Sequence, residues 1–124
     1  MTLRAYTGAA IFDGRHLHYR HAALVERGLF TEMVPEDHIP ANASAIPLGG
    51  GTILPGFVDL QVNGGGGVMF NDRTSPEGIA TISAAHRRTG TRAFLPTLIT
   101  DTPERTHMAV KAVEQAIAQG VPGV

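Results

Sequence analysis

Hydrophobic and polar positions follow two different patterns, one before and one after residue 52. In the first part, short apolar stretches end at turn residues, a pattern typical of β-strands that pair as hairpins. Turns are predicted at Asp13–Gly14 and Arg27–Gly28. The strands that flank these turns are Ala5–Phe12 with His16–Tyr19, and Ala22–Glu26 with Leu29–Val34. The first part is therefore predicted to be a small β layer.

After residue 52 the pattern predicts alternating strands and helices. The Pro55–Gly56 turn leads to the short apolar strand Phe57–Leu60, which has the character of a buried parallel strand. Two helices are predicted where a capping residue is followed by proline and glutamate. These helices begin at Ser75–Glu77 and Thr102–Glu104 and end at Gly90 and Gly120, with the strand Thr91–Ile99 between them.

Each predicted helix carries apolar side chains on one face. Residues spaced by three and four positions lie on the same side of a helix, and such a stripe normally faces the core. Ile79, Ile82 and His86 lie on one face of the first helix, and Val110, Val113 and Ile117 form an apolar stripe on the second. We therefore expect these side chains to pack against the strands.

The order strand, helix, strand, helix predicts an α/β fold with parallel strands. Two such units amount to about a quarter of an eight-stranded barrel, which typically needs about 250 residues. Two or three strands cannot close a sheet, and their unpaired edges would be long. We therefore expect the chain to be an incomplete fragment, the front part of a larger protein.

Composition narrows the functional classes. The 124 residues are 43% hydrophobic and 17% charged, with a formal net charge of -1, so no basic excess points to nucleic acid. Cysteine is absent, which excludes disulfides and thiolate chemistry. No apolar run approaches the roughly 20 residues that a membrane helix needs. We expect a soluble cytoplasmic protein that binds neither membrane nor nucleic acid.

Two amide side chains end the first strand of the second part. Gln61 and Asn63 alternate onto one face of the strand, and Gly64–Gly67 follows at once. Polar residues at the carboxyl ends of barrel strands commonly line active sites. Amides are poor ligands for zinc-type metals but bind polar substrates or water well. The alternative is that both amides only satisfy the loop backbone. The glycines are expected to form a tight flexible loop with room for a ligand or a neighbouring loop.

Other candidate motifs favour structural roles. Gly64–Gly67 lacks the lysine and hydroxyl residue of a phosphate loop, and Met69 stands where a dinucleotide fingerprint needs its third glycine. The pair His16 and His18, with His21 nearby, is favoured as a solvated strand face over a metal site. Packing or surface positions are expected for the helical His86 and His107, and a supporting role for Asp59.

Residues 50–100 resemble a known family, and the first 50 residues share only its β-rich texture. The stretch Leu54-Pro55-Gly56-Phe57-Val58-Asp59 resembles the first barrel strand of the metal-dependent amidohydrolase superfamily, which usually ends in His-x-His. Gln61 and Asn63 occupy those two places, as in many N-acetylglucosamine-6-phosphate deacetylases. The following Gly64–Val68 and Phe70–Asp72, and the later stretch Gly90–Thr100, are similar to the same family.

The resemblance implies a fold and an activity. Residues 1–53 would form the N-terminal part of a small β-sandwich, and residues 54–124 the first two βα units of a (β/α)8 TIM-like barrel. The complete enzyme would hydrolyse N-acetylglucosamine 6-phosphate to glucosamine 6-phosphate and acetate in amino-sugar catabolism. It would use one zinc-like divalent metal, bound by a glutamate and two histidines, and an aspartate as base. Members of the family are commonly homodimers.

The resemblance assigns no catalytic or metal-binding residue to this chain. The family's metal ligands and aspartate lie beyond the matched stretches, so the isolated 124 residues are expected to be inactive and to bind no metal. Gln61 and Asn63 are expected to line the active site, with Thr97 as a further candidate at the end of the second strand. The alternatives are another amidohydrolase, against which the missing His-x-His speaks, or a truncated interaction module without catalysis.

Overall fold

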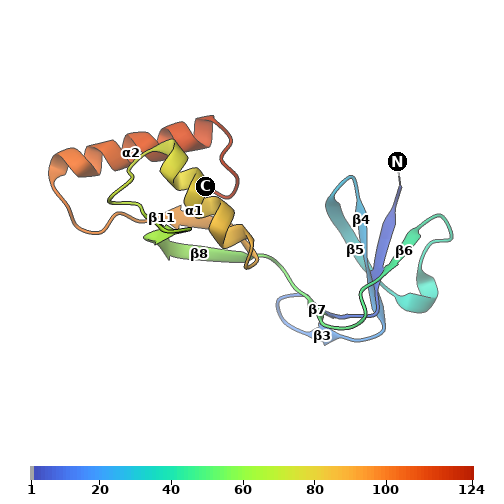
Figure 1. Cartoon of the computed structure of the whole chain (residues 1–124). Helices are drawn as coiled ribbons and strands as arrows, with labels where there is room; N and C mark the ends of the chain where they lie inside the picture. The colour runs from blue at the N-terminus through green and yellow to red at the C-terminus, as the bar shows by residue number, and fades with distance from the viewer. Residues whose placement is uncertain (1) are drawn as a thin grey trace. The chain divides into compact units, whose positions relative to one another are not determined.

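A computed structural model describes residues 2–124 (Figure 1). The chain forms a mixed α/β structure with two compact units, the first ending at Pro55 and the second beginning at Gly56. Neither helix in the described part of the chain has the length and apolar character needed to cross a bilayer.

The first unit consists of strands in two sheets. Its elements are β1 (Arg4–Thr7), β2 (Ala10–Phe12), β3 (Leu17–His18), β4 (His21–Glu26), β5 (Leu29–Pro35), the 3-10 turn η1 (Glu36–His38), β6 (Ser44–Pro47) and β7 (Thr52–Ile53). One sheet has the order β5-β4-β1-β6, with β1 antiparallel to β4 and parallel to β6. The other has the order β3-β2-β7, in which β2 is antiparallel to β3 and parallel to β7.

Both predicted hairpins are confirmed, but one predicted strand is divided. Strand β2 pairs with β3, and β4 pairs with β5 around Arg27 and Gly28, whose φ angles of 54° and 79° suit a tight hairpin turn. The prediction of one strand over Ala5–Phe12 was wrong. At Gly8 the backbone N–H donates to Glu36 Oε1 (3.2 Å) rather than to a neighbouring strand, and the two halves join different sheets.

The four-stranded sheet of the first unit packs apolar side chains on both faces. Ala5, Ala22 and Leu24 are buried together on one face. On the other face, Tyr6 and Ala23 line an apolar groove of about 880 Å³. Residue Ile11 of the second sheet lines the same groove, so the two sheets enclose apolar space between them.

The second unit places two helices on two parallel strands. Its elements are β8 (Phe57–Val62), β9 (Gly64–Gly65), β10 (Val68–Met69), α1 (Pro76–Arg87), β11 (Thr91–Pro96) and α2 (Pro103–Ala118). Strand β8 is parallel to β11, and the helices lie on the same side of this pair (Figure 1). The buried core joins the strand residues Val62 and Phe94 to Phe70, Ile79 and Ile82 and to three alanines of α2.

The helix starts agree with the sequence prediction. Ser75 precedes α1 and its hydroxyl accepts a hydrogen bond from the Gly78 N–H (3.2 Å). Thr102 precedes α2 and accepts in the same way from the Arg105 N–H (3.3 Å). In both helices proline occupies the first position, where the missing N–H leaves no intrahelical bond unmade.

Three details of the second unit differ from prediction. The strand over Phe57–Leu60 was predicted to be buried, but Phe57, Val58 and Leu60 are all exposed because the helices cover only one face of β8 and bury only Val62 of this strand. The buried residues of α2 are Ala109, Ala112 and Ala116. Of the predicted stripe only Val113 packs partly against the core, whereas Val110 and Ile117 are exposed, so the prediction was wrong for these two. Small side chains face the core there because α2 packs closely against α1. The predicted strand Thr91–Ile99 is also shorter, since β11 ends at Pro96, which has no N–H to continue a backbone ladder.

Candidate functional site at the strand ends

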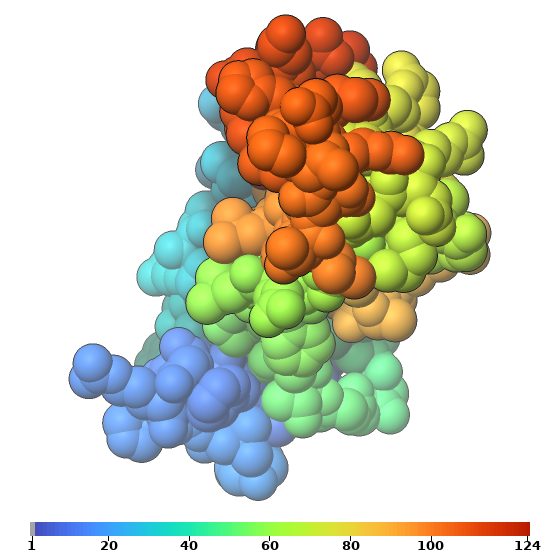
Figure 2. All heavy atoms as spheres, turned by 90° about the vertical axis from the view of Figure 1, so that its left-hand side faces the viewer, coloured from blue at the N-terminus to red at the C-terminus, as the bar shows by residue number. Residues whose placement is uncertain are grey.

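The carboxyl ends of β8 and β11 lie side by side. The two strands are parallel, and Val62 is paired with Pro96 at the last position of their register. Val62 and Phe94 are both buried toward the helices, so strand alternation directs Gln61 and Asn63 to the opposite face. Figure 2 looks onto this end of the second unit, where the orange segment after β11 lies beside the yellow-green segment after β10.

Asn63 and Thr97 are directly bonded. The side-chain Nδ2 of Asn63 donates to the backbone carbonyl of Thr97 (2.9 Å). The Thr97 N–H in turn donates to the carbonyl of Val62 (2.8 Å), while its hydroxyl donates to the carbonyl of Leu95 (3.0 Å). Both residues are half-buried. Asn63 therefore holds the two strand ends together and keeps its Oδ1 available as an acceptor.

Gln61 differs from Asn63 in its surroundings. It is exposed, and its backbone N–H donates to Asp59 Oδ1 (3.1 Å). Within residues 2–124 no hydrogen bond to its side-chain amide is found, so donor and acceptor both face solvent. Asp59 is half-buried and serves here as a backbone acceptor, in line with the supporting role expected from the sequence.

The glycine segment is tight, as expected, but it is a packed hairpin, which corrects the expectation of room for a ligand at Gly64 and Gly65. Strands β9 and β10 pair across a turn at Gly66 and Gly67, whose φ angles of 62° and 77° favour glycine. A Cβ on Gly64 would overlap the carbonyl oxygen of Val68, and one on Gly65 would lie 2.9 Å from the His86 ring. These two glycines permit close packing and leave no room for a ligand on that side.

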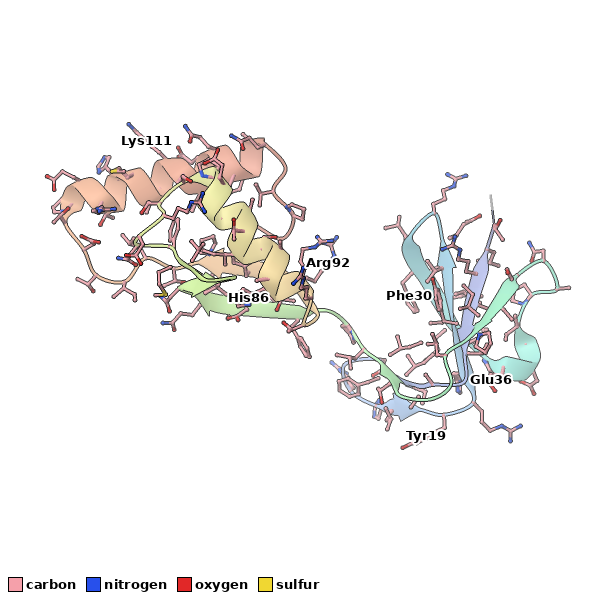
Figure 3. All side chains as sticks on the ribbon, viewed as in Figure 1. Tyr19, Phe30, Glu36, His86, Arg92 and Lys111 are labelled. Atoms are coloured by element: carbon pink, nitrogen blue, oxygen red, sulfur yellow. The ribbon has the colours of Figure 1, made fainter. Side chains whose placement is uncertain are left out.

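His86 holds this hairpin from helix α1. Its Nε2 lies 2.9 Å from the carbonyl oxygen of Gly64, which fits donation from the imidazole. The ring also stacks on Phe94, with 6.1 Å between centroids. Figure 3 shows the side chain reaching from α1 toward the strands. The packing role expected for His86 is thus accompanied by a specific hydrogen bond that spacing alone did not reveal.

A second amide at this edge, Asn71, was not singled out as a site residue from the sequence. Its Oδ1 accepts the N–H of Ile99 (2.9 Å), and its Nδ2 donates to the carbonyl of Ile99 and to Asp101 Oδ2, each at 3.0 Å. The carbonyl of Asn71 accepts from Arg105 Nη1 (3.1 Å). The available signal was an asparagine eight residues after Asn63, but no local pattern specifies a partner 28 residues away.

Asp101 is the charged member of this network. The N–H of Thr102 (2.9 Å) and then Asn71 Nδ2 hold the pKa of its carboxyl below the usual range, with Arg105 nearby. The carboxyl is exposed, so the effect comes from hydrogen bonds to the ionised form rather than from burial. Asp101 therefore carries a negative charge beside the strand ends at neutral pH.

Metal ligands are not assembled by the residues that the structure describes. Among residues 2–124, no group of three or more His, Asp or Glu side chains has an arrangement that could hold a metal. His16, His18 and His21 lie near one another in the first unit, where His18 Nε2 contacts Asp13 Oδ2 (2.8 Å). His107 is exposed on α2. The amides at the strand ends do not by themselves fit a metal centre.

The geometry defines a class: parallel strands that carry polar amides at their carboxyl ends, covered by helices on the other face. Comparison with solved structures gives N-acetylglucosamine-6-phosphate deacetylase from Pasteurella multocida, with a TM-score of 0.86 and 32% identity. The match covers 94% of this chain and 31% of that one. No protein-family model matches the chain.

Two curated relatives agree with this structure. N-acetylgalactosamine-6-phosphate deacetylase of Shewanella sp. is 50% identical over 74 residues, covering 60% of this chain and 19% of the relative. N-acetylglucosamine-6-phosphate deacetylase of Haemophilus influenzae is 35% identical over 94 residues, covering 76% of this chain and 25% of the relative. The chain thus spans at most a quarter of these relatives' length, and it is similar to their N-terminal part. The resemblance drawn from the sequence is confirmed.

Proposed function

We propose that this chain is the N-terminal part of a deacetylase that hydrolyses N-acetylglucosamine 6-phosphate to glucosamine 6-phosphate and acetate. The observation that carries the proposal is the match in both sequence and fold to the Pasteurella multocida deacetylase over 94% of the chain. The reaction adds water to the acetyl carbon and breaks its bond to nitrogen. Such an enzyme must bind a polar sugar and orient its amide.

The proposal includes the architecture of the complete enzyme. Residues 54–124 would be the first two βα units of a TIM-like barrel, supported by the parallel pair of β8 and β11 with both helices on one face. Residues 1–53 would be part of a small β-sandwich, supported by the two sheets that line one apolar groove. In a barrel, the edge that carries Asn63 would face the active site.

Within that site, the amides would contact substrate or water. Asn63 uses Nδ2 to bind the Thr97 carbonyl, which leaves its Oδ1 to accept from a substrate hydroxyl, an amide N–H or water. Gln61 is exposed and offers both donor and acceptor. Thr97 would act mainly through its backbone, because its hydroxyl is already bonded to Leu95. None of the three is proposed to transfer a proton.

The single divalent metal expected of the complete enzyme does not fit these residues alone. Its ligands would have to come from outside the strand ends described here, since Gln61 and Asn63 are amides and no ligand cluster is present within residues 2–124. The isolated chain is accordingly expected to bind no stoichiometric zinc. Calorimetric titration of the 124 residues with zinc tests this, and tight one-to-one binding would contradict it.

The proposed activity is tested on the protein isolated from its natural source. Its intact mass is measured first, and acetate release from N-acetylglucosamine 6-phosphate is then followed enzymatically. Release that depends on the 6-phosphate supports the proposal. A folded protein that releases no acetate would contradict it and would favour the non-catalytic interaction module. Hydrolysis of a different amide instead would favour another amidohydrolase.

N-acetylgalactosamine 6-phosphate is a second candidate substrate. The Shewanella relative named for that sugar is 50% identical, higher than the 35% of the Haemophilus protein, although over fewer residues. The two sugars differ only in the orientation of one hydroxyl, so parallel assays with matched concentrations compare their kcat/KM directly.

A cytoplasmic homodimer is also proposed, supported by the family likeness and, for the compartment, by the absence of cysteine.

A further inference from the structure

Backbone pairing between the strands stops just before the candidate site. Strand β11 ends at Pro96, and the last backbone bond of this edge runs from the Thr97 N–H to the Val62 carbonyl (2.8 Å). Beyond this bond, side chains join the segment after β11 to the segments that follow β8 and β10. Asn63 binds the carbonyl of Thr97, and Asn71 binds both the N–H and the carbonyl of Ile99.

The side-chain amide of Asn71 makes the same pair of hydrogen bonds to Ile99 that a neighbouring strand would make. One planar amide accepts the Ile99 N–H at 2.9 Å and donates to the Ile99 carbonyl at 3.0 Å, which are the two bonds that a neighbouring strand would make. Two further bonds tie it to the start of α2, through Asp101 Oδ2 and Arg105 Nη1. The Thr74 hydroxyl also donates to the Asn71 carbonyl (3.2 Å), so five hydrogen bonds to one residue give this position a single geometry.

Asn71 directly follows the residue that closes the base of the glycine hairpin. The Phe70 N–H donates to the Asn63 carbonyl (2.7 Å), so Asn63 and Phe70 close the hairpin and Asn71 follows directly. Movement of Asn71 would therefore be passed to Asn63 through the neighbouring Phe70 and its short backbone bond. Since Asn63 and Asn71 bind positions two residues apart, Thr97 and Ile99, the two amides together prevent the segments from separating.

We infer that Asn71 is a positioning residue of the proposed deacetylase. It acts as a clamp between the segments after β10 and β11 and thereby orients the Asn63 amide. The inference rests on the proposed function only for its effect on catalysis, because the clamp itself is defined by the hydrogen bonds of this chain. Asn71 is not proposed to touch the reacting atoms.

The test uses the natural protein and four substituted forms: Asn71→Ala, Asn71→Asp, the double variant Asn71→Asp with Asp101→Asn, and Asn42→Ala as a matched control on an exposed asparagine. Amide hydrogen exchange at Ile99 reports on the clamp without any substrate. Steady-state kinetics of acetate release report on positioning. Thermal unfolding shows whether each variant is folded.

For Asn71→Ala we expect at least about tenfold faster exchange at Ile99 and a fall in kcat of roughly 10- to 100-fold, with KM changed less than about threefold. Asn71→Asp keeps the acceptor for the Ile99 N–H, but its carboxylate repels the carboxylate of Asp101 and cannot donate to it. Adding Asp101→Asn should restore part of the lost kcat, because the new amide returns a donor between the two positions. Asn42→Ala should leave both readouts unchanged.

Other results overturn specific parts of the inference. Unchanged exchange at Ile99 in Asn71→Ala would refute the clamp. Faster exchange with an unchanged kcat would refute positioning and leave a purely structural bond. If the unsubstituted protein released no acetate from either sugar phosphate, the proposed function and the catalytic part would fail together, while the exchange measurement would still decide the clamp.

Discussion

The side chain of Asn63 donates a hydrogen bond of 2.9 Å to the backbone carbonyl of Thr97, 34 residues later in the chain. This bond joins the ends of the two parallel strands and selects the orientation of the Asn63 amide. With one Nδ2 hydrogen engaged by Thr97, the Oδ1 acceptor and the second N–H remain for a ligand. Asn63 thus combines a structural bond with a free acceptor at the strand end.

Asn63→Ala should therefore impair the proposed deacetylase activity more than His16→Ala. The first substitution removes both the bond to Thr97 and the free acceptor, and we expect kcat/KM to fall about 10- to 100-fold. His16 lies in the hairpin of the first unit, so its loss should change kcat/KM less than about twofold. Initial rates on the natural protein measure both. Equal, negligible losses would refute the placement of Asn63 in the active site.

Gly65→Ala should destabilise the protein because of His86. The added Cβ would lie 2.9 Å from an imidazole that the Gly64 carbonyl and Phe94 hold in place, at an expected cost of about 1–3 kcal/mol in the free energy of unfolding. Denaturant unfolding of the variant measures this cost. The φ of Gly65 lies outside the left-handed region, so alanine itself is tolerated there.

A double-mutant cycle separates this clash from other effects. In a His86→Ala background the ring is absent, and Gly65→Ala should become neutral or stabilise slightly, by up to about 1 kcal/mol, because alanine restricts the unfolded chain. The coupling between positions 65 and 86 should then exceed about 1 kcal/mol. Purely additive costs would show that the imidazole does not set the requirement for glycine at position 65.

Local signals in the sequence predicted most elements but not their contacts. Ser75 and Thr102 cap the helices as expected, since a cap depends only on residues three positions away. The glycine hairpin was misjudged because its packing depends on His86, 22 residues later. In the same way Asn71 gained its role from Ile99, a partner that no periodicity specifies.

The error in α2 has a related physical origin. Hydrophobicity favours valine and isoleucine over alanine, so a stripe of Val110, Val113 and Ile117 was predicted to face the core. The contact of α2 with α1 decides otherwise, because the face of α2 that is turned to the core carries Ala109, Ala112 and Ala116, with Val113 at its edge. Interhelical spacing is a tertiary property, and the apolar period of one helix does not contain it.

This packing predicts that substitutions at two adjacent positions of α2 change the free energy of unfolding by very different amounts. Ala116 is fully buried, so Ala116→Leu should overfill the interface and lower the free energy of unfolding by about 1–3 kcal/mol. Ile117 is 58% exposed, so Ile117→Ala should change it by less than about 0.5 kcal/mol. Urea unfolding of the 124-residue chain compares the two. A larger loss for Ile117→Ala would restore the predicted stripe.

Asp13 should make the first unit less stable as the pH falls into the acid range. Its carboxylate accepts the N–H groups of His16 and Arg15, each at 2.7 Å, and contacts the His18 ring at 2.8 Å. The His16 N–H, then His18 and the Arg15 N–H, hold the pKa of this carboxyl well below its usual range. Because the folded-state pKa lies below the unfolded value of about 3.9, the unfolded chain binds more protons as the pH falls.

The stabilisation by Asp13 is therefore fully present above about pH 5 and is lost progressively as the pH falls through 4 toward the folded-state pKa. Asp13→Asn removes the ionisable group, so its melting temperature should lie below that of the unsubstituted chain at pH 7, and the gap should narrow by pH 3. The exposed Asp72, changed to asparagine, is the control and should show no such pH-dependent gap. A gap for Asp13→Asn that is the same at pH 7 and pH 3 would show that the ionised carboxylate does not hold the hairpin.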